Sequence, residues 1–453
     1  MSKVIKLKKG LDINLVGAAQ EKLTTLPLAE RYALTPSDFG GVVPKLLVKV
    51  GDTVKAGTPL FFDKNNPELL FTSPVSGEVF AINRGEKRKI LNIEITPSET
   101  QEFESFQIPE LASASKEQVS ALILKSGLWP SIMQRPYGII ASQTDMPKAI
   151  FISGFDSAPM APDYNYALAS RKADLQKGID ALSKLTEGKV YLGLKYGTSG
   201  VLNSLVGVEQ YFFKGAHPAG NVGVQIHHID PINKGEIAWT VNIQDVAMIG
   251  KLFNEGKVSF TKTIALTGSE IMESKYVSFV SGAPLSSVVK KIDIVAQNEG
   301  DSVRLIYGNA LTGIKAEQGS YVNYYTSQIT AIKEGDKYEM FGWMLPRFKK
   351  FSVSRAYFSW LTPKKQYTLD TNLNGGPRPF VVSGLYEKYL PMDIYPVYLL
   401  KAILAGDIDK MENLGIYEVV EEDFALCEFV DPSKNDIQEI IREGINLMIK
   451  ELN

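Results

Sequence analysis

Residues 40–79 read GGVVPKLLVKVGDTVKAGTPLFFDKNNPELLFTSPVSGEV, and this stretch decides the fold of the first part of the chain. The turn Gly51–Gly57 (GDTVKAG) separates two short runs of β-branched and aliphatic residues, and Ser73–Gly77 (SPVSG) leads into a third. Glycine and aspartate supply the backbone angles that tight turns need. Short strands between such turns predict a small β-sandwich or barrel.

The pattern resembles the lipoyl and biotinyl carrier domains, which are flattened β-barrels with a modified lysine at a hairpin. Asp63-Lys64 falls near that hairpin, but the sequence continues as Asp63–Pro67 (DKNNP). Lipoyl domains usually show Asp-Lys-Ala, and biotinyl domains show Met-Lys-Met. Pro67 has a fixed φ and no N–H, which changes the hairpin geometry that a modifying enzyme would read. We therefore favour an unmodified surface lysine over a modified Lys64, and an intact mass separates the two interpretations.

Composition indicates an ordinary soluble protein of several domains. A chain of 453 residues holds roughly three domains. Hydrophobic residues make up 44% and charged residues 22%, and the net charge of −2 gives no general attraction to nucleic acid. The opening residues alternate, so we expect no secretory leader. No run of 18 apolar residues occurs, so we expect any membrane role to be peripheral or to depend on partner subunits.

The cysteine and histidine counts exclude several kinds of site. The single cysteine, Cys427, forms no internal disulfide, no Cys-x-x-Cys pair and no cysteine-ligated cluster. Its apolar neighbours are typical of a buried small hydrophobe. His217, His227 and His228 do not have the spacing of a zinc site, so we expect ordinary hydrogen-bonded histidines.

A new unit begins at Pro147. Lys148–Gly154 (KAIFISG) predicts a strand, 166–185 a long helix and Lys189–Leu194 a second strand, which together form a βαβ unit with a parallel pair. A dinucleotide or flavin site needs Gly-x-Gly-x-x-Gly at the first strand-to-helix turn. Here Gly154–Met160 reads GFDSAPM. We therefore expect a Rossmann-like topology that does not bind NADH.

Other segments predict the remaining elements. Lys3–Val16 predicts a leading strand and turn that join the first barrel. Ser115–Gln118 (SKEQ) matches a capping box, which places a helix after it that ends near Gly127. Residues 258–345 show short strands between turns, and helix signals dominate after Pro346. The last helix has one apolar face, made of Ile437, Ile440, Ile441, Ile445 and Met448.

Ordered motifs along nearly the whole chain resemble one family. They include Gly51-Asp52 and Asp63-Lys64 in the barrel stretch, Ser126–Trp129 with Arg135-Pro136, Ala149–Ile152, Leu185–Tyr191, His217–Gly220, Asn242–Val246 with Gly250–Phe253, Leu311–Gly313, Phe341–Trp343, Tyr386-Glu387 with Met392–Ile394, and Glu421–Cys427. The chain resembles the A subunit of the Na+-translocating NADH:quinone oxidoreductase (the Nqr complex). That family is also similar to the NADH/FMN-binding subunit of respiratory complex I and to the C subunit of Rnf complexes.

The resemblance implies a multidomain α+β and α/β fold. We expect a lipoyl/biotinyl-like barrel-sandwich hybrid in residues 1–100 and a Rossmann-like domain with a helical linker in residues 101–256. A soluble-ligand-binding β-grasp (SLBB) domain is expected in residues 257–345, and a helical domain in residues 346–453.

The resemblance also implies a function. The chain is expected to be a peripheral, cofactor-free subunit on the cytoplasmic face of the bacterial inner membrane, docked chiefly on membrane subunits. The complex oxidises NADH, reduces ubiquinone and pumps sodium ions out of the cytoplasm. FAD, FMN and an iron–sulfur centre are implied in partner subunits, so the isolated chain is not expected to be catalytic. The resemblance implicates this subunit in ubiquinone binding and in assembly of the complex.

The residues agree with a cofactor-free subunit. The complex I relative needs a glycine-rich FMN/NADH loop and four cluster cysteines, and this chain has neither. Many members of the Nqr family carry a second cysteine and Pro-Gly-Lys just after the position of Cys427, whereas Glu428–Lys434 reads EFVDPSK here. This departure argues further against a cluster.

A quinone site needs an apolar slot with a few hydrogen-bond donors. The first candidate is the segment 129–137 (WPSIMQRPY), and the second is the rim of the barrel. The residues expected to contact quinone or another subunit are Trp129, Arg135, Pro136 and Tyr137 in the first, and Asp38, Phe39 and Gly41 in the second. The alternative for the first is an interdomain linker anchored by Trp129.

Residues 341–360 interleave seven aromatic residues with four cationic ones. This belt suits a face that lies on a membrane protein or on lipid headgroups, or a partly buried β-to-helix connection. The alternative function for the whole chain is a stand-alone lipoyl-like or flavin-bearing electron carrier related to the Rnf C subunit. An absorption spectrum separates the two, because a flavin or a cluster absorbs visible light.

Overall fold

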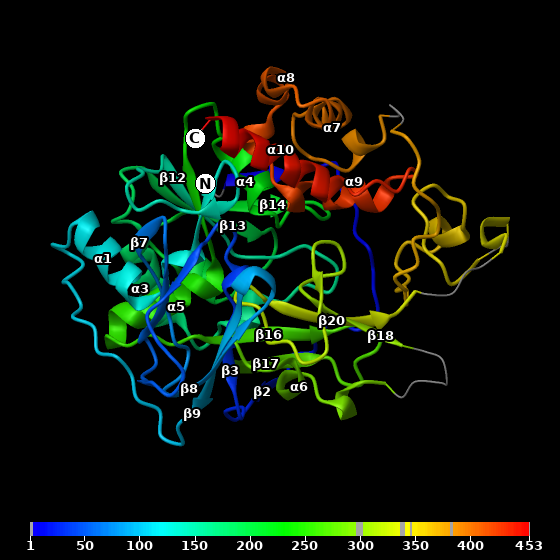
Figure 1. The fold of residues 1–453 in the computed structure, drawn as a ribbon. Helices are drawn as coiled ribbons and strands as arrows, with labels where there is room; N and C mark the ends of the chain where they lie inside the picture. The colour runs from blue at the N-terminus through cyan, green and yellow to red at the C-terminus, as the bar shows by residue number, and fades with distance from the viewer. Residues whose placement is uncertain (1–2, 296–301, 336–339, 345–346, 381–383, 453) are drawn as a thin grey trace.

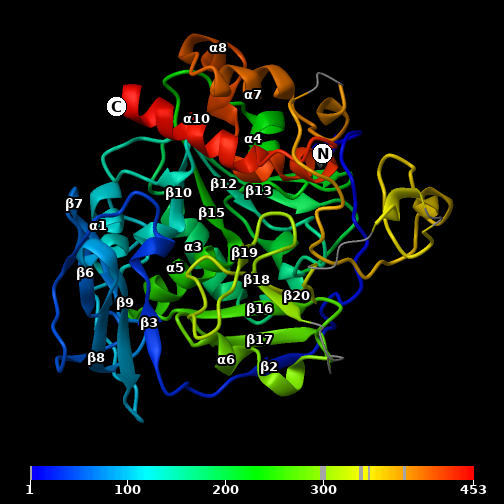
Figure 2. The same cartoon turned by 45° about the vertical axis from the view of Figure 1, so that its right-hand side comes forward.

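The computed structural model describes residues 3–295, 302–335, 340–344, 347–380 and 384–452. Within these residues the strands form four sheets of seven, six, four and three strands. Figures 1 and 2 show the two larger sheets in the middle of the molecule, the small sheets beside them and the last helices across the top.

The two small sheets form the predicted barrel-like unit. All of their strand pairs are antiparallel. One sheet has the order β3-β9-β8-β5, with β3 at Tyr32–Leu34, β9 at Ile90–Pro97, β8 at Gly77–Arg84 and β5 at Thr53–Val54. The other has the order β4-β6-β7, with β4 at Pro44–Leu46, β6 at Pro59–Asp63 and β7 at Asn66–Thr72. The buried rings of Phe61 and Phe71, on the neighbouring strands β6 and β7, stack 4.5 Å apart.

The seven-stranded sheet forms the α/β unit. Its order is β1-β14-β13-β12-β15-β10-β11. The strands are β1 at Lys3–Lys6, β14 at Glu209–Lys214, β13 at Lys189–Lys195, β12 at Ala149–Ser153, β15 at Ala238–Asn242, β10 at Ile132–Arg135 and β11 at Ile139–Ile140. The first five are parallel, which confirms the predicted pair β12–β13, and the last two are antiparallel.

The N-terminal strand does not join the barrel. β1 pairs in parallel with β14 at the edge of the seven-stranded sheet, where Lys3 lies beside Tyr211 and Lys6 beside Lys214. The expectation that Lys3–Val16 belongs to the barrel is therefore wrong. An edge strand can pair with any exposed edge, and the local sequence of a four-residue strand does not specify its partner.

Two helices cover one face of this sheet at very short distance. α3 (Lys172–Leu182) and α5 (Ile243–Glu255) meet at glycines. A Cβ atom at Gly250 would lie 1.7 Å from the carbonyl oxygen of Asp174, and one at Gly178 would lie 2.1 Å from that of Val246. Only glycine permits this approach, so the glycines set the helix spacing. α4 (Val222–Ile229) covers the other face.

The predicted helix over 166–185 is interrupted. The chain forms α2 (Tyr164–Ala167), turns, and then enters α3. Arg171 stands at the turn, where its guanidinium donates to the Ala247 carbonyl oxygen at 2.9 Å and contacts the Asp174 carboxylate at 3.0 Å. This link to α5 is a tertiary contact, which the helical periodicity of the segment does not reveal.

The six-stranded sheet has the order β19-β18-β20-β16-β17-β2. Its strands are β19 at Ile314–Lys315, β18 at Val303–Tyr307, β20 at Gln328–Lys333, β16 at Thr261–Thr267, β17 at Lys275–Val280 and β2 at Leu23–Thr25, and the short helix α6 covers Leu285–Val288. β2 comes from the N-terminal region and pairs in parallel with β17. The N-terminal segment thus ties both large sheets together.

The C-terminal helices form a separate core. They are α7 (Pro396–Leu404), α8 (Ile408–Asn413), α9 (Ala425–Val430) and α10 (Ile437–Leu452). The predicted apolar face of α10 packs into this core through Ile437, Ile441, Ile445 and Met448. α-Helices begin only at Pro396 among the described residues after Pro346, later than expected. None of the described helices has the length and apolar composition needed to cross a bilayer.

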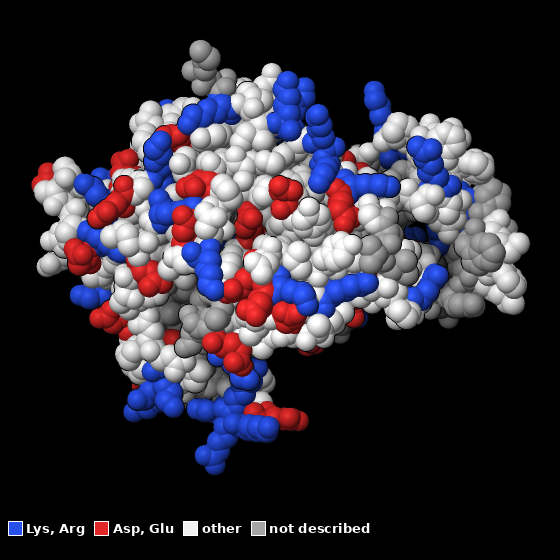
Figure 3. All heavy atoms as spheres, turned by 90° about the horizontal axis from the view of Figure 1, so that it is seen from above, with Lys and Arg blue, Asp and Glu red and all other residues white. Residues whose placement is uncertain are grey.

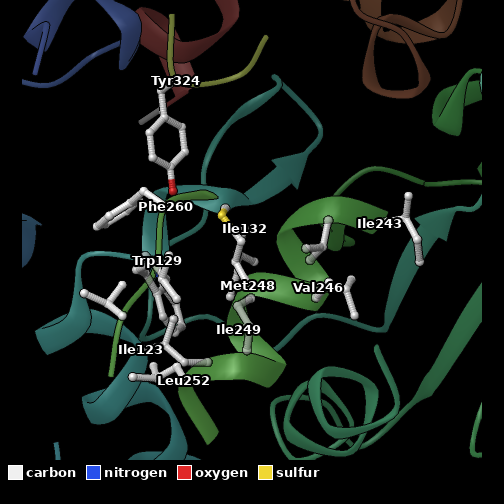
Figure 4. Close-up of a cluster of buried hydrophobic side chains, with 14 of the residues drawn as sticks. Ile123, Trp129, Ile132, Ile243, Val246, Met248, Ile249, Leu252, Phe260 and Tyr324 are labelled. Carbon is white, nitrogen blue, oxygen red and sulfur yellow. The ribbon is translucent and has the colours of Figure 1, made fainter. Parts of the chain in front are cut away.

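The main core runs from the barrel through the α/β unit to the six-stranded sheet. α1 (Lys116–Ser126) starts at the predicted capping box, in which Ser115 and Gln118 bond reciprocally, and ends at Gly127 with φ of 77°. Figure 4 shows Trp129, just after this helix, beside Ile123 and Leu252, with Phe260 and Tyr324 above. Apolar side chains of the barrel, the α/β unit and the six-stranded sheet therefore pack into one continuous hydrophobic core.

Candidate functional site

A cleft of about 1050 Å³ opens where the parts of the chain meet. It lies at the carboxyl ends of β12 and β15, where Ser153 and Asn242 are neighbours in register. In open α/β sheets, ligands bind in this crevice. The other walls come from the barrel, the six-stranded sheet and the C-terminal helices, including Asp38, Tyr307, Gln328, Glu422 and Arg442.

The loop after β12 closes on its own chain. The Asp156 carboxylate accepts a hydrogen bond from the Ala158 N–H at 2.8 Å, and burial raises the pKa of Asp156. The Ser157 hydroxyl accepts the Gly220 N–H at 2.8 Å and lies 3.0 Å from Nδ1 of His217. Burial lowers the pKa of His217 to about 4, so this imidazole is neutral at pH 7. The backbone donors at Ala158 and Gly220 are therefore already bonded.

The N-terminus of α4 beside the cleft meets a carboxylate of the chain itself. A Cβ atom at Gly223 would lie 2.6 Å from both carboxylate oxygens of Asp423, so a side chain at this position would collide with them. Helix N-termini favour negative charge, and phosphates commonly occupy them in nucleotide sites. Here Asp423 takes that position.

Arg135 joins the α/β unit to the C-terminal helices. Its guanidinium, at the end of β10, lies 3.2 Å from the Asp423 carboxylate and 2.7 Å from that of Glu422. Arg135 and Asp423 are buried, whereas 41% of the Glu422 side chain stays accessible in the cleft. Partial desolvation and the neighbouring Asp423 carboxylate raise the pKa of Glu422, although Arg135 lowers it.

Asp38 faces the cleft from the rim of the barrel. Its carboxylate accepts the Tyr324 N–H at 2.9 Å, yet burial raises the pKa of Asp38 to about 6. A further carboxylate, Asp245, lies 3.0 Å from the ammonium group of the buried Lys262. Asp38 and Glu422 are thus cleft carboxyls whose pKa values are raised.

Only some of the residues that the sequence predicts for quinone or subunit contact line the cleft. Arg135 and Asp38 line the cleft. Trp129 is fully buried, donates through its indole N–H to the Ala141 carbonyl oxygen at 2.7 Å, and does not line the cleft. This placement suits the alternative interpretation of Trp129 as an anchor in the core.

The other expected residues surround the site without lining the large cleft. A cis peptide bond joins Arg135 to the buried Pro136. Tyr137 is half-buried, and its ring lies 6.4 Å from that of Tyr417. Phe39 is buried against Phe71 and lines a separate cavity of about 20 Å³, and Gly41 is exposed.

Sequence reasoning missed the aromatic lining. These rings come from α2, from the end of β18 and from loops, and they are Phe155, Tyr164, Tyr307, Tyr321 and Tyr325. Their positions carry no motif, because the residues are far apart in the sequence and meet only in the folded chain. The ends of β12 and β15 were the available signal, since the crevice of an open α/β sheet lies there.

Fold and site together define a multidomain protein with a barrel-sandwich unit, an α/β unit without a glycine-rich phosphate loop, and a shared cleft. Three family models match it: the NqrA N-terminal barrel-sandwich hybrid domain over residues 5–98, the NqrA second alpha/beta domain over 114–258, and the NQRA C-terminal domain, an SLBB domain, over 263–318. These matches confirm the predicted fold class.

Curated relatives match over the full length. The chain is 36% identical to the A subunit of the Na(+)-translocating NADH-quinone reductase of Hahella chejuensis, over 99% of this chain and 100% of that protein. It is 37% identical to the Yersinia pestis bv. Antiqua protein of the same name, with the same coverage. The chain belongs to this family, the A subunits of Na(+)-translocating NADH-quinone reductases, as the sequence motifs predicted.

A solved NAD+-reducing [NiFe]-hydrogenase shows a weaker likeness. Its TM-score is 0.39 and its identity 11%, over 76% of this chain and 62% of that chain. A likeness of this strength is too weak to support a conclusion about the fold or the function of this chain. Within the described residues, no group of three or more histidine, cysteine, aspartate or glutamate side chains is placed to hold a metal ion.

Proposed function

We propose that this chain is the peripheral, cofactor-free subunit of a Na+-translocating NADH:quinone oxidoreductase and that its cleft receives the quinone headgroup. Full-length relatives at 36–37% identity carry that enzyme's name, which supports the assignment to the complex. NADH is then oxidised on another subunit that holds FAD and an iron–sulfur centre. Membrane subunits hold FMN and pump sodium, and this chain docks on them at the cytoplasmic face.

The observation that carries the quinone assignment is the chemistry of the cleft. A quinone headgroup is flat, uncharged and bears two carbonyl acceptors, so it needs ring contacts and donors. The cleft offers five aromatic side chains and the Arg135 guanidinium. Its volume of about 1050 Å³ is at the upper end of the range for small-molecule sites. Trp129 is buried in the core, and Phe39 lies 6.0 Å from Tyr325, one of the rings that line the cleft. Pro136, Tyr137 and Gly41 are left for shaping the site or for subunit contact.

The carboxyl groups suit the reduction. A quinone that accepts two electrons from NADH, through the partner subunits, also takes up two protons to become a quinol. The pKa of Asp38 is raised to about 6 and that of Glu422 is raised as well, so a fraction of these carboxyls carries a proton near neutral pH. A protonated carboxyl can donate a hydrogen bond to a carbonyl and pass on its proton.

The assignment is tested by filling the cleft. Asn323 lines the cleft and is half-buried, so Asn323→Trp adds a bulky ring inside it. Calorimetric titration with a short-chain ubiquinone should show binding to the wild-type chain and a loss of at least about tenfold in this variant. The control is Asn65→Trp, at the exposed turn between β6 and β7, which should bind like wild type.

The assembled complex gives the kinetic version of this test. Asn323→Trp should raise the quinone Michaelis constant and leave NADH oxidation by an artificial acceptor unchanged, because that reaction occurs on another subunit. Equal loss of both activities would show that the substitution disturbs assembly. Unchanged quinone affinity in both formats would remove the cleft from the quinone site.

A further inference from the structure

A lobe made of the described residues in 340–344 and 347–369 projects from the body of the molecule between β20 and α7. It is the yellow part that stands apart on the right in Figures 1 and 2. Its described residues form short 3-10 turns, including Phe358–Leu361, and irregular loops. We call it the aromatic–basic lobe. It does not belong to the cleft, whose lining contains no residue of this range.

The lobe exposes large apolar side chains. Seven of them, each between 41% and 69% accessible, fall within 22 residues: Met340, Phe341, Met344, Phe348, Phe358, Trp360 and Leu361. Single exposed apolar residues are common on proteins, but a concentration of them marks an interaction surface. The rings of Phe348 and Phe358 stack on each other at 5.4 Å, and both remain open to solvent.

All charged side chains of the lobe are positive. Residues 340–369 contain six lysine and arginine residues and no aspartate or glutamate, in a chain whose net charge is −2. Lys349, Arg355 and Lys364 are exposed, and none of them forms an ion pair with a described residue. The Arg355 guanidinium lies over the Trp360 ring at 5.6 Å. At the right of Figure 3, this end of the molecule shows blue spheres among white ones.

We propose that the aromatic–basic lobe binds the anionic phospholipid surface of a membrane. Tryptophan and phenylalanine side chains insert at the boundary between headgroups and acyl chains, while lysine and arginine reach the phosphates. A protein interface gathers its apolar residues in a core that is depleted of lysine. Here cations alternate with exposed rings along the same loops, which favours a lipid surface. This contact adds to docking on partner subunits and is independent of quinone binding.

Vesicle flotation tests the proposal with the full-length isolated chain. Wild-type protein should float with vesicles of phosphatidylglycerol and phosphatidylcholine at low salt, and binding should weaken as salt rises. Binding to pure phosphatidylcholine should be much weaker. Each cation near an anionic surface contributes about 1 kcal/mol, so Lys349→Glu/Arg355→Glu/Lys364→Glu should lower the partition coefficient by roughly a hundredfold.

The control variant reverses the charge of three exposed lysines that lie outside the aromatic–basic lobe. Lys64→Glu/Lys125→Glu/Lys172→Glu gives the same net charge, and these lysines lie on the barrel, at the end of α1 and at the start of α3. This variant should keep most of the binding. Phe348→Ala/Trp360→Ala retains every charge and should weaken binding at high and low salt alike. Thermal unfolding confirms that each variant is folded.

Three results would overturn the proposal. These are no flotation of the wild-type chain with anionic vesicles, equal binding to neutral vesicles, and equal loss in both triple variants. Attachment only to vesicles that contain the membrane subunits would assign the lobe to a protein contact instead. Ubiquinone titration of the same variants should give wild-type affinity, which separates a failure here from a failure of the quinone assignment.

Discussion

Asp38 couples the barrel rim to the cleft through one carboxyl group. Its carboxylate accepts a hydrogen bond from the Tyr324 N–H. The ionised form is nevertheless disfavoured, because the side chain is largely buried away from water. The unfolded chain releases this proton near pH 3.8, whereas the folded protein holds it until about pH 6. Raising the pH through this window therefore favours the unfolded state and lowers the free energy of unfolding.

Asp38→Asn should consequently stabilise the protein at pH 7. The amide oxygen can still accept the Tyr324 N–H, and no charge is buried. We expect a gain of about 2 kcal/mol at pH 7 that shrinks toward zero below about pH 3, where the native carboxyl is largely protonated in both states. Denaturant unfolding at the two pH values measures it. Asp393→Asn, at an exposed position, is the control, and an equal gain there would refute the burial argument.

At the scale of elements, the glycines between α3 and α5 set the thickness of the α/β layer. The two helices approach until backbone atoms of one would touch a Cβ atom of the other. This spacing lets both helices press their apolar faces onto the sheet, where Leu175, Ile179, Val246 and Ile249 are fully buried. The close approach explains why small residues occupy the middle of two otherwise ordinary amphipathic helices.

Gly250→Ala should therefore destabilise the fold. The new methyl group would stand 1.7 Å from the Asp174 carbonyl oxygen, and backbone cannot move aside as a flexible side chain can. Overpacking of this kind costs about 1–3 kcal/mol, which outweighs the gain in helix propensity. Thermal unfolding should show a melting temperature several degrees lower. The control Gly376→Ala has open space around its Cβ position, and a comparable loss there would contradict the packing argument.

At the scale of the whole molecule, the cleft lies where nucleotides bind in many α/β proteins, but acidic side chains occupy the places that would contact phosphate. Asp156 and Glu422 line it, and Asp423 stands at the N-terminus of α4. A pyrophosphate would meet these carboxylates in place of free backbone donors. Quinone has no charge to repel, so the same cleft can accept it.

We accordingly expect no NADH binding by the isolated chain. Calorimetric titration with NADH should show no saturable heat, because the glycine-rich loop is missing and the cleft is acidic. Titration of the same sample with a short-chain ubiquinone serves as the positive control. A dissociation constant for NADH in the micromolar range would overturn the interpretation of an α/β unit that does not bind nucleotide.

The sequence by itself determined the elements whose signals are local. The turn Gly51–Gly57 predicts the barrel strands, the capping box at Ser115 predicts α1, and the alternation of strand and helix after Pro147 predicts the parallel pair. Turn and cap signals act within a few residues through backbone angles and hydrogen bonds, so the sequence expresses them directly. The long ordered motifs determined the family in the same way.

Only the tertiary structure decided where distant segments meet. It placed β1 and β2 in two different sheets, because an edge strand pairs with whichever edge the rest of the fold exposes. In the folded chain Trp129 lies in the core, whereas Arg135 lines the cleft. Glu422, 287 residues after Arg135 in the sequence, lies beside it there. Burial, pKa and charge pairing depend on these long-range contacts, and no local pattern specifies them.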